Sequence, residues 1–97
     1  MSVAIDIARR NDGAPQTLSF DVVVRDAAGK SRHRVTMSRA LAERLGGGVS
    51  SAEQCLIAAF RFLLDREPKE QILAQFDVSV ISLYFPEFER ELSKYLG

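Results

Sequence analysis

His33 and Cys55 are the only histidine and the only cysteine of the chain, and they are the residue types of a nucleophile–base pair. Such a pair needs a third group that orients the imidazole and an electropositive, partly exposed thiol. Strand alternation instead places His33 on the same face as Val35 and Met37, and Cys55 lies in an apolar segment. The pattern therefore favours two core residues over a catalytic dyad.

Two other patterns could carry chemistry. The glycines at 46–48 precede a helix start, where backbone N–H groups can hold an anion. A phosphate-binding loop also needs a lysine and a buried strand, which are missing, so a helix stop is the better interpretation. Glu87, Glu89 and Glu91 fit the solvated face of the last helix. We expect no catalytic, cofactor-binding or metal-binding residue, and we expect the protein not to be an enzyme.

Basic residues concentrate between residues 25 and 44, where six stand against two acidic ones. Arginines clustered on one face are typical of sites for nucleic acid or another polyanion. Arg25, Arg32 and Arg34 are the candidate anion-binding residues. No aromatic side chain is interleaved with them for base stacking, and Asp21 and Asp26 are near enough in the sequence to relieve their repulsion. A solvated, charged face is the alternative interpretation.

Composition limits the class of protein. The 97 residues suit one domain, and apolar residues at 46% with charged residues at 27% are ordinary for a globular chain. A single cysteine rules out an intramolecular disulfide. The first residues do not resemble a signal peptide, and no apolar run is long enough to cross a membrane. We expect one domain in the cytoplasm, with no cofactor and no membrane partner.

The first third of the chain has the period-two pattern of strands. Alternation predicts strands at 3–8, 18–25 and 31–37, joined into an antiparallel meander. The register that keeps one face apolar sets Val22 opposite Val35 and Arg25 opposite Arg32. Loop residues 26–30 would close the hairpin.

The remainder has the pattern of helices, predicted at 39–45, 51–65, 68–76, 79–85 and 87–96. Ser38 is the expected N-cap of the first helix, which would stop at Gly46. Ser50 and Glu53 have the spacing of a capping box for the second. Pro68 suits the first turn of the third.

The stretch 78–85 fits either a strand or a helix, and we favour a short helix capped by Asp77 or Ser79. Together these elements predict an α+β fold, in which a three-stranded antiparallel β-meander is followed by three to four helices packed on one face.

Apolar side chains that need a cover are the other functional clue. In helix 51–65, Ile57 and Leu64 project into the polar side of the helix. Either another element of the chain covers them or a partner does, and the first alternative is favoured. Tyr84 and Phe85, next to Pro86, form a second candidate partner contact.

The C-terminal third contains the run FRFLLDREPKEQIL, then FDVSVI and YFPE. This stretch resembles a small uncharacterised bacterial protein family. The resemblance implies a prokaryotic origin, and it implies no activity and no site residues.

Three classes of function remain open from the sequence. The leading hypothesis is a non-catalytic module that binds another protein or a second copy of itself through Ile57 and Leu64 or through Tyr84 and Phe85. The second is a nucleic-acid or polyanion binder that uses the basic hairpin, and the third is an accessory subunit of an enzyme.

Overall fold

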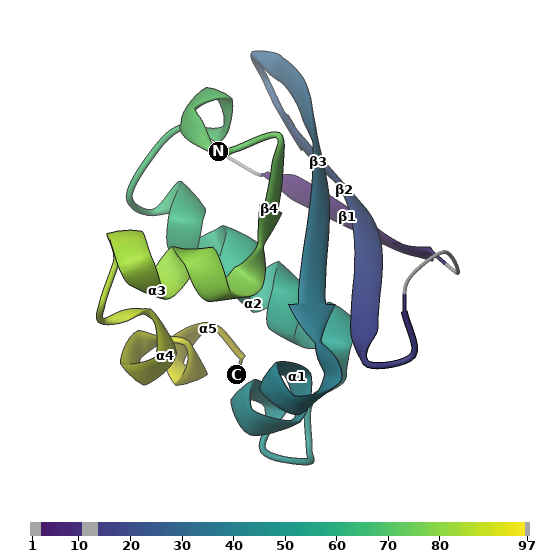
Figure 1. Ribbon diagram of the computed structural model, residues 1–97. Helices are drawn as coiled ribbons and strands as arrows, with labels where there is room; N and C mark the ends of the chain where they lie inside the picture. The colour runs from purple at the N-terminus through teal and green to yellow at the C-terminus, as the bar shows by residue number, and fades with distance from the viewer. Residues whose placement is uncertain (1–2, 11–13, 97) are drawn as a thin grey trace.

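The computed structural model describes residues 3–10 and 14–96, and its fold is α+β (Figure 1). Four strands form one sheet in the order β1-β2-β3-β4. They are β1 (Ala4–Arg10), β2 (Thr17–Asp26), β3 (Gly29–Ser38) and β4 (Gln75–Asp77). The first three form the predicted antiparallel meander, and β4 adds a short strand parallel to β3.

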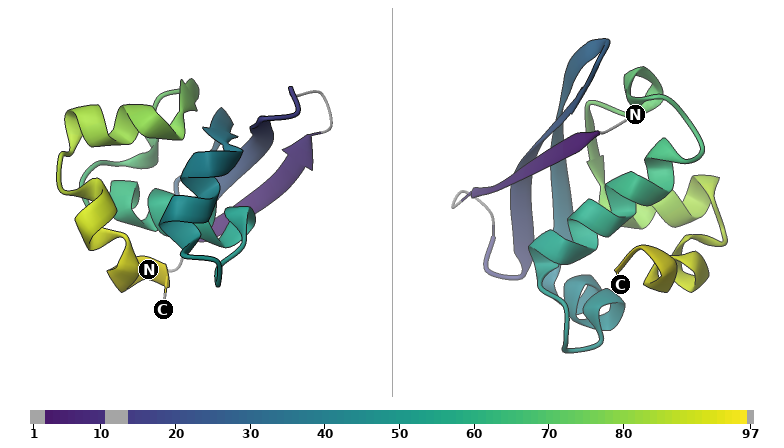
Figure 2. Two further views of the ribbon diagram at one scale, coloured as in Figure 1. Left: turned by 60° about the horizontal axis from the view of Figure 1, so that its bottom comes forward. Right: turned by 180° about the vertical axis from the view of Figure 1, so that it is seen from behind.

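The helices lie on one face of this sheet, as Figure 2 shows from behind the first view. They are α1 (Arg39–Gly46), α2 (Ala52–Leu64), α3 (Ile81–Tyr84), α4 (Phe88–Glu91) and α5 (Ser93–Leu96), with two 3-10 turns, η1 (Lys69–Gln71) and η2 (Val78–Val80). The long helix α2 covers the sheet, and its apolar side chains, with Phe60 and Phe62 fully buried, form the middle of the core.

The hairpin register differs from the predicted one by two residues. Val22 faces His33, Phe20 faces Val35, and Arg25 faces Lys30 instead of Arg32. The hairpin loop has only two residues, because the Asp26 side chain accepts a hydrogen bond from Ala28 N at 2.9 Å and Gly29 takes a φ of 138°. A shift of two keeps each side chain on its face, so the core assignment is unaffected.

Two helix ends lie one residue beyond their predicted positions. Ser38 caps α1 as predicted, accepting a hydrogen bond from Leu41 N, but the helix runs through Gly46 and the left-handed residue is Gly47, with φ 59°. The capping box of α2 is formed by Ser51 and Gln54 rather than by Ser50 and Glu53. Ser51 has the extended backbone of an N-cap, and its side chain and that of Gln54 each accept from the other residue's backbone amide.

The predicted helix at 68–76 is wrong. Pro68 has extended backbone angles, a single 3-10 turn follows, and Gln75–Asp77 pair with β3. Local apolar spacing favoured a helix, but the open edge of β3 offers hydrogen bonds to an extended chain, and Phe76 is buried beside Phe60. Tertiary pairing outweighs helix propensity in such a short segment.

The two C-terminal helical predictions are supported with changed bounds. Residues 78–84 form η2 and α3, and the helix ends at Tyr84 because Phe85 precedes a proline and takes a φ of −130°. The last predicted helix is divided into α4 and α5 around Leu92. Tyr95 in α5 donates a hydrogen bond to Asp65 at 2.6 Å, which holds α5 against the C-terminal end of α2.

Candidate protein-interaction site

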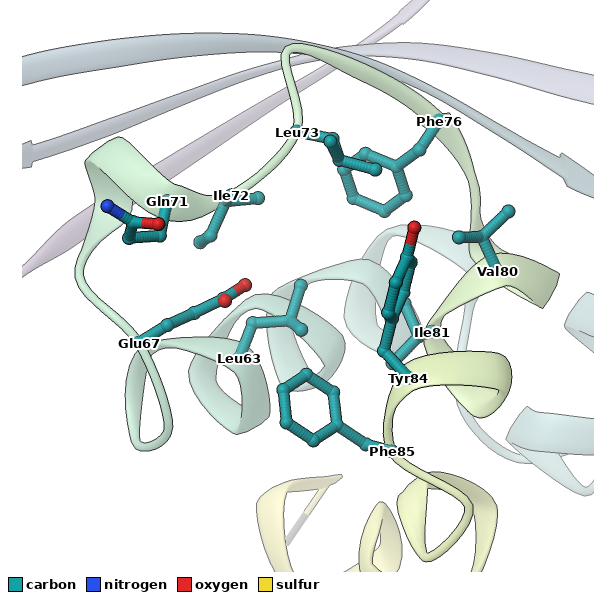
Figure 3. Close-up of a pocket in the computed structure, with 10 residues that line it drawn as sticks. All are labelled: Leu63, Glu67, Gln71, Ile72, Leu73, Phe76, Val80, Ile81, Tyr84 and Phe85. Atoms are coloured by element: carbon teal, nitrogen blue, oxygen red, sulfur yellow. The ribbon is translucent and has the colours of Figure 1, made fainter.

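An open groove of about 240 Å³ lies between the C-terminal end of α2, the segment from η1 to β4, and α3 (Figure 3). Its floor consists of four side chains that belong to the core, Leu63, Ile72, Phe76 and Ile81. The floor is therefore rigid, because each of these residues is also packed from below.

The lips of the groove are apolar but open to solvent. Leu73 is 49% exposed and Tyr84 is 68% exposed, and Val80 and Phe85 are half-buried beside them. In Figure 3 the Tyr84 ring stands upright at one side of the opening, with its hydroxyl toward Leu73 and Phe76. A large apolar side chain could enter between these lips and contact the floor.

Hydrogen bonds to β3 hold the segment that carries Leu73 and Phe76. The imidazole Nδ1 of His33 donates to the carbonyl of Leu73 at 2.8 Å, since a carbonyl can only accept. One residue farther along, the Arg34 amide donates to the carbonyl of Ala74 at 2.7 Å. The upper wall of the groove is thus a fixed part of the sheet edge.

Asp77 joins this wall to α3. It accepts a hydrogen bond from the Thr36 hydroxyl at 2.6 Å and caps η2 by accepting from the Ser79 amide at 3.0 Å. Burial of the Asp77 carboxyl raises its pKa, but the hydrogen bonds from Thr36 and Ser79 outweigh this and leave the pKa below its ordinary value. The predicted cap is confirmed, and it sets the direction in which α3 leaves the sheet.

A buried lysine joins the other end of the wall to the hairpin. The side chain of Lys69 in η1 is only 2% exposed, and its ammonium contacts Asp26 at 2.9 Å and Glu70 at 2.5 Å. The hydrogen bond to Glu70 is the main cause of the raised Lys69 pKa, and the hydrogen bond to Asp26 is the second. In return, the Lys69 ammonium holds the Asp26 pKa below its ordinary value. Burial of this cation is tolerated because it is paired on both sides.

Two polar residues, Glu67 and Gln71, complete the lining. Glu67 is half-buried, and in Figure 3 its carboxylate extends toward Leu63 and Ile72. Within the described residues, the Glu67 carboxylate has no hydrogen-bond or ion-pair partner. The neighbouring Arg66 is engaged elsewhere, with its guanidinium over the Phe62 ring at 3.6 Å and near Glu87 at 3.4 Å.

Of the candidate partner-contact residues, Tyr84 and Phe85 lie together in this groove. Ile57 and Leu64 do not line it. Both are half-buried, and Leu64 packs against the core from the side of α2. The structure thus separates the two patches that the sequence offered as alternatives.

The three candidate anion-binding arginines lie on the outer face of the sheet, away from the helices. Arg25 pairs with Asp6 of β1 at 3.2 Å, and Arg34 approaches Asp21 at 3.5 Å. Asp21 also accepts a hydrogen bond from Arg10 at 2.9 Å, which lowers its pKa. Arg32 is exposed and has no ion-pair partner among the described residues. Anion binding by these arginines stays a prediction.

His33 and Cys55 are both buried, as predicted. The second ring nitrogen of His33 meets the Ser31 hydroxyl at 2.7 Å, so both nitrogens are engaged by Ser31 and Leu73. Burial raises the pKa of the Cys55 thiol, which disfavours the nucleophilic thiolate. In residues 3–10 and 14–96, no group of three potential metal ligands comes together, and no helix is long and apolar enough to span a membrane.

Sequence reasoning missed Glu67, Leu73 and the floor residue Ile72. The predicted helix at 68–76 placed Ile72, Leu73 and Phe76 on one side, whereas the extended chain leaves Leu73 exposed and buries the other two. The proline and the acidic residues around it were the available clue, since they interrupt the helical pattern between α2 and Ile72.

Comparisons with protein-family models, curated proteins and solved structures found no match to this chain.

Proposed function

We propose that this protein is a non-catalytic interaction module that binds another protein through the groove between α2, β4 and α3. The observation that supports this proposal most is the exposure of Leu73 and Tyr84 above a buried apolar floor. Apolar surface with an aromatic side chain at its edge is typical of protein-binding sites. The sequence hypothesis based on Tyr84 and Phe85 points to the same surface.

The size of the groove favours a protein partner over a metabolite. Sites for small ligands usually enclose about 300–1,000 Å³ and contain several convergent polar groups. This groove measures about 240 Å³, and its polar side chains are Glu67, Gln71 and the Tyr84 hydroxyl at the rim. It has room for one or two large side chains of a partner, which would act as anchors.

The test is affinity capture from a native lysate with matched variants. Leu73→Ser combined with Tyr84→Ser removes the lips, while both residues are exposed enough that the fold should persist. Val49→Ser is the control, because Val49 is 91% exposed and precedes the opposite end of α2, about 20 Å away along the helix. A protein retained by the parent and by Val49→Ser, but lost by the double variant, is the expected result.

The captured protein, once purified, gives the quantitative test. We expect the double variant to bind it at least tenfold more weakly than the parent, as removal of two anchor contacts implies. Light scattering of the pure chain decides between a different partner and a second copy. Equal binding by parent and double variant would contradict the proposal. Capture of an enzyme through the groove would identify the module as an accessory subunit.

A further inference from the structure

The groove contains one charged side chain, and that charge is uncompensated within the described chain. The other seven acidic side chains described between residues 49 and 96 each have a hydrogen-bond or ion-pair partner. Those partners are Arg9 for Glu53, Tyr95 for Asp65, Lys69 for Glu70, Thr36 and Ser79 for Asp77, Arg66 for Glu87, Arg44 for Glu89 and Lys94 for Glu91. Glu67 is the exception.

The position of Glu67 makes this exception informative. The Glu67 side chain is half-buried, and its carboxylate, which still reaches solvent, extends beside Leu63 and Ile72 (Figure 3). An apolar partner that filled the groove would remove water from the Glu67 carboxylate. Burying an unpaired carboxylate is costly, so an entirely apolar partner would be disfavoured at this point.

We infer that the protein segment bound in the groove carries a lysine or arginine next to its apolar anchor, and that Glu67 pairs with this cation. The inference rests on the proposed function and adds the chemistry of the partner. Glu67 is the one charged side chain of the lining, so the electrostatic complement of the groove is a cation. The apolar anchor supplies affinity, and the pair with Glu67 supplies orientation and selectivity.

The closing experiment uses a displayed library of random 16-residue peptides as the probe. Peptides are selected on the parent protein, and those that also bind the Leu73→Ser, Tyr84→Ser double variant are discarded, so the survivors depend on the groove. We expect each survivor to combine a large apolar residue with a lysine or arginine at a constant spacing.

A selected peptide is then measured against two glutamine variants. We expect Glu67→Gln to bind it about three- to tenfold more weakly, since a partly desolvated ion pair is lost. Glu43→Gln is the matched control, because Glu43 in α1 is exposed and its carboxylate also lacks a partner among the described residues. This variant should change the affinity less than about twofold. Glu67→Lys should regain binding when the peptide's basic residue is replaced by glutamate.

The outcomes separate the two proposals. Survivors without an enriched basic residue, or equal affinity of parent and Glu67→Gln, would overturn the role of Glu67 and leave the groove as a binding site. If no peptide survives the selection, the groove is not a peptide-binding site, and both proposals are overturned.

Discussion

The outer face of the sheet and the groove on the helical side differ in how their charges are arranged. On the outer face, Arg25 meets Asp6 and Arg34 meets Asp21, so carboxylates on neighbouring strands partly neutralise the basic cluster. In the groove, a single carboxylate stands among apolar side chains with no partner among the described residues. Charge that is dense in the sequence can thus be paired across strands, whereas the carboxylate of the groove is distinguished only by its surroundings in the fold.

The largest expected effect concerns the groove floor. Phe76→Ala should destabilise the protein by about 3–5 kcal/mol, because Phe76 is buried against Phe60 and fastens β4 to the core. Leu73→Ala, on the same segment but half exposed, should cost about 1 kcal/mol or less. Urea unfolding followed by circular dichroism measures both.

The loss expected for Phe76→Ala is a large part of the free energy of unfolding of a small domain, so this variant can fail to fold. Phe76→Leu is therefore the second variant, with an expected destabilisation of about 1 kcal/mol. If Phe76→Ala and Leu73→Ala are equally mild, the floor is not part of the core. The description of a buried floor below exposed lips would then be wrong.

An intermediate effect on stability is expected for Asp26→Asn. Asp26 of the hairpin meets Lys69 of η1 where the sheet joins the segment that forms the groove wall. Asp26→Asn keeps the oxygen that accepts from Ala28 and removes only the charge. The Lys69 ammonium lowers the Asp26 pKa, so this pair stabilises the fold above the unfolded value of 3.8 and the contribution is lost as the pH falls through the folded pKa. The melting temperature of the parent should exceed that of Asp26→Asn at pH 6, and the gap should narrow toward pH 2.

At alkaline pH the stabilisation by this pair is lost in the opposite direction, as the pH rises. Lys69 has a raised pKa, so its contribution is complete below 10.5 and is lost as the pH rises through the folded value. The difference between parent and Asp26→Asn should therefore be constant between about pH 5 and 9. A gap that is unchanged down to pH 2 would show that Asp26 is not paired.

The smallest effect is expected on the outer face. With Arg25 and Arg34 paired, millimolar phosphate at fixed ionic strength should leave the melting temperature of the parent unchanged. Asp21→Asn releases Arg34 from its carboxylate and should make melting phosphate-dependent, with a rise of about 2 °C or less. If phosphate instead stabilises the parent and Arg32→Ser abolishes the effect, these arginines form an anion site and the contrast with the groove fails.

Features of the fold that depend on neighbours in the sequence were predicted better than features that depend on distant residues. The period-two alternation around Val22 and the Ser38 cap depend on neighbours in the sequence, and both were predicted correctly. The hairpin register was off by two residues, because Asp26 and Gly29 permit a tighter loop than the apolar pattern requires. Alternation fixes the face of a residue but not its exact partner across the hairpin.

For the candidate site, the sequence offered Tyr84 and Phe85, next to a proline, and also Ile57 and Leu64, for which cover within the chain was the favoured interpretation. It could not show which patch is open to solvent, since exposure depends on the elements that pack against each patch. It also gave no reason to single out Glu67, which is one of thirteen acidic residues. Its distinction is that it faces apolar walls and has no described partner.

The sequence by itself determined the fold class, the antiparallel meander, the side of each strand that is buried and the positions of most helices. These features follow from periodicity and from capping residues, which act over a few positions. Only the tertiary structure decided that residues 75–77 join the sheet, that Lys69 is buried against Asp26, and that Leu73 and Tyr84 frame a groove around Glu67. Each of these features depends on contacts between residues far apart in the chain. A local sequence pattern does not predict which of these contacts form, because their free energy depends on the packing of the whole fold.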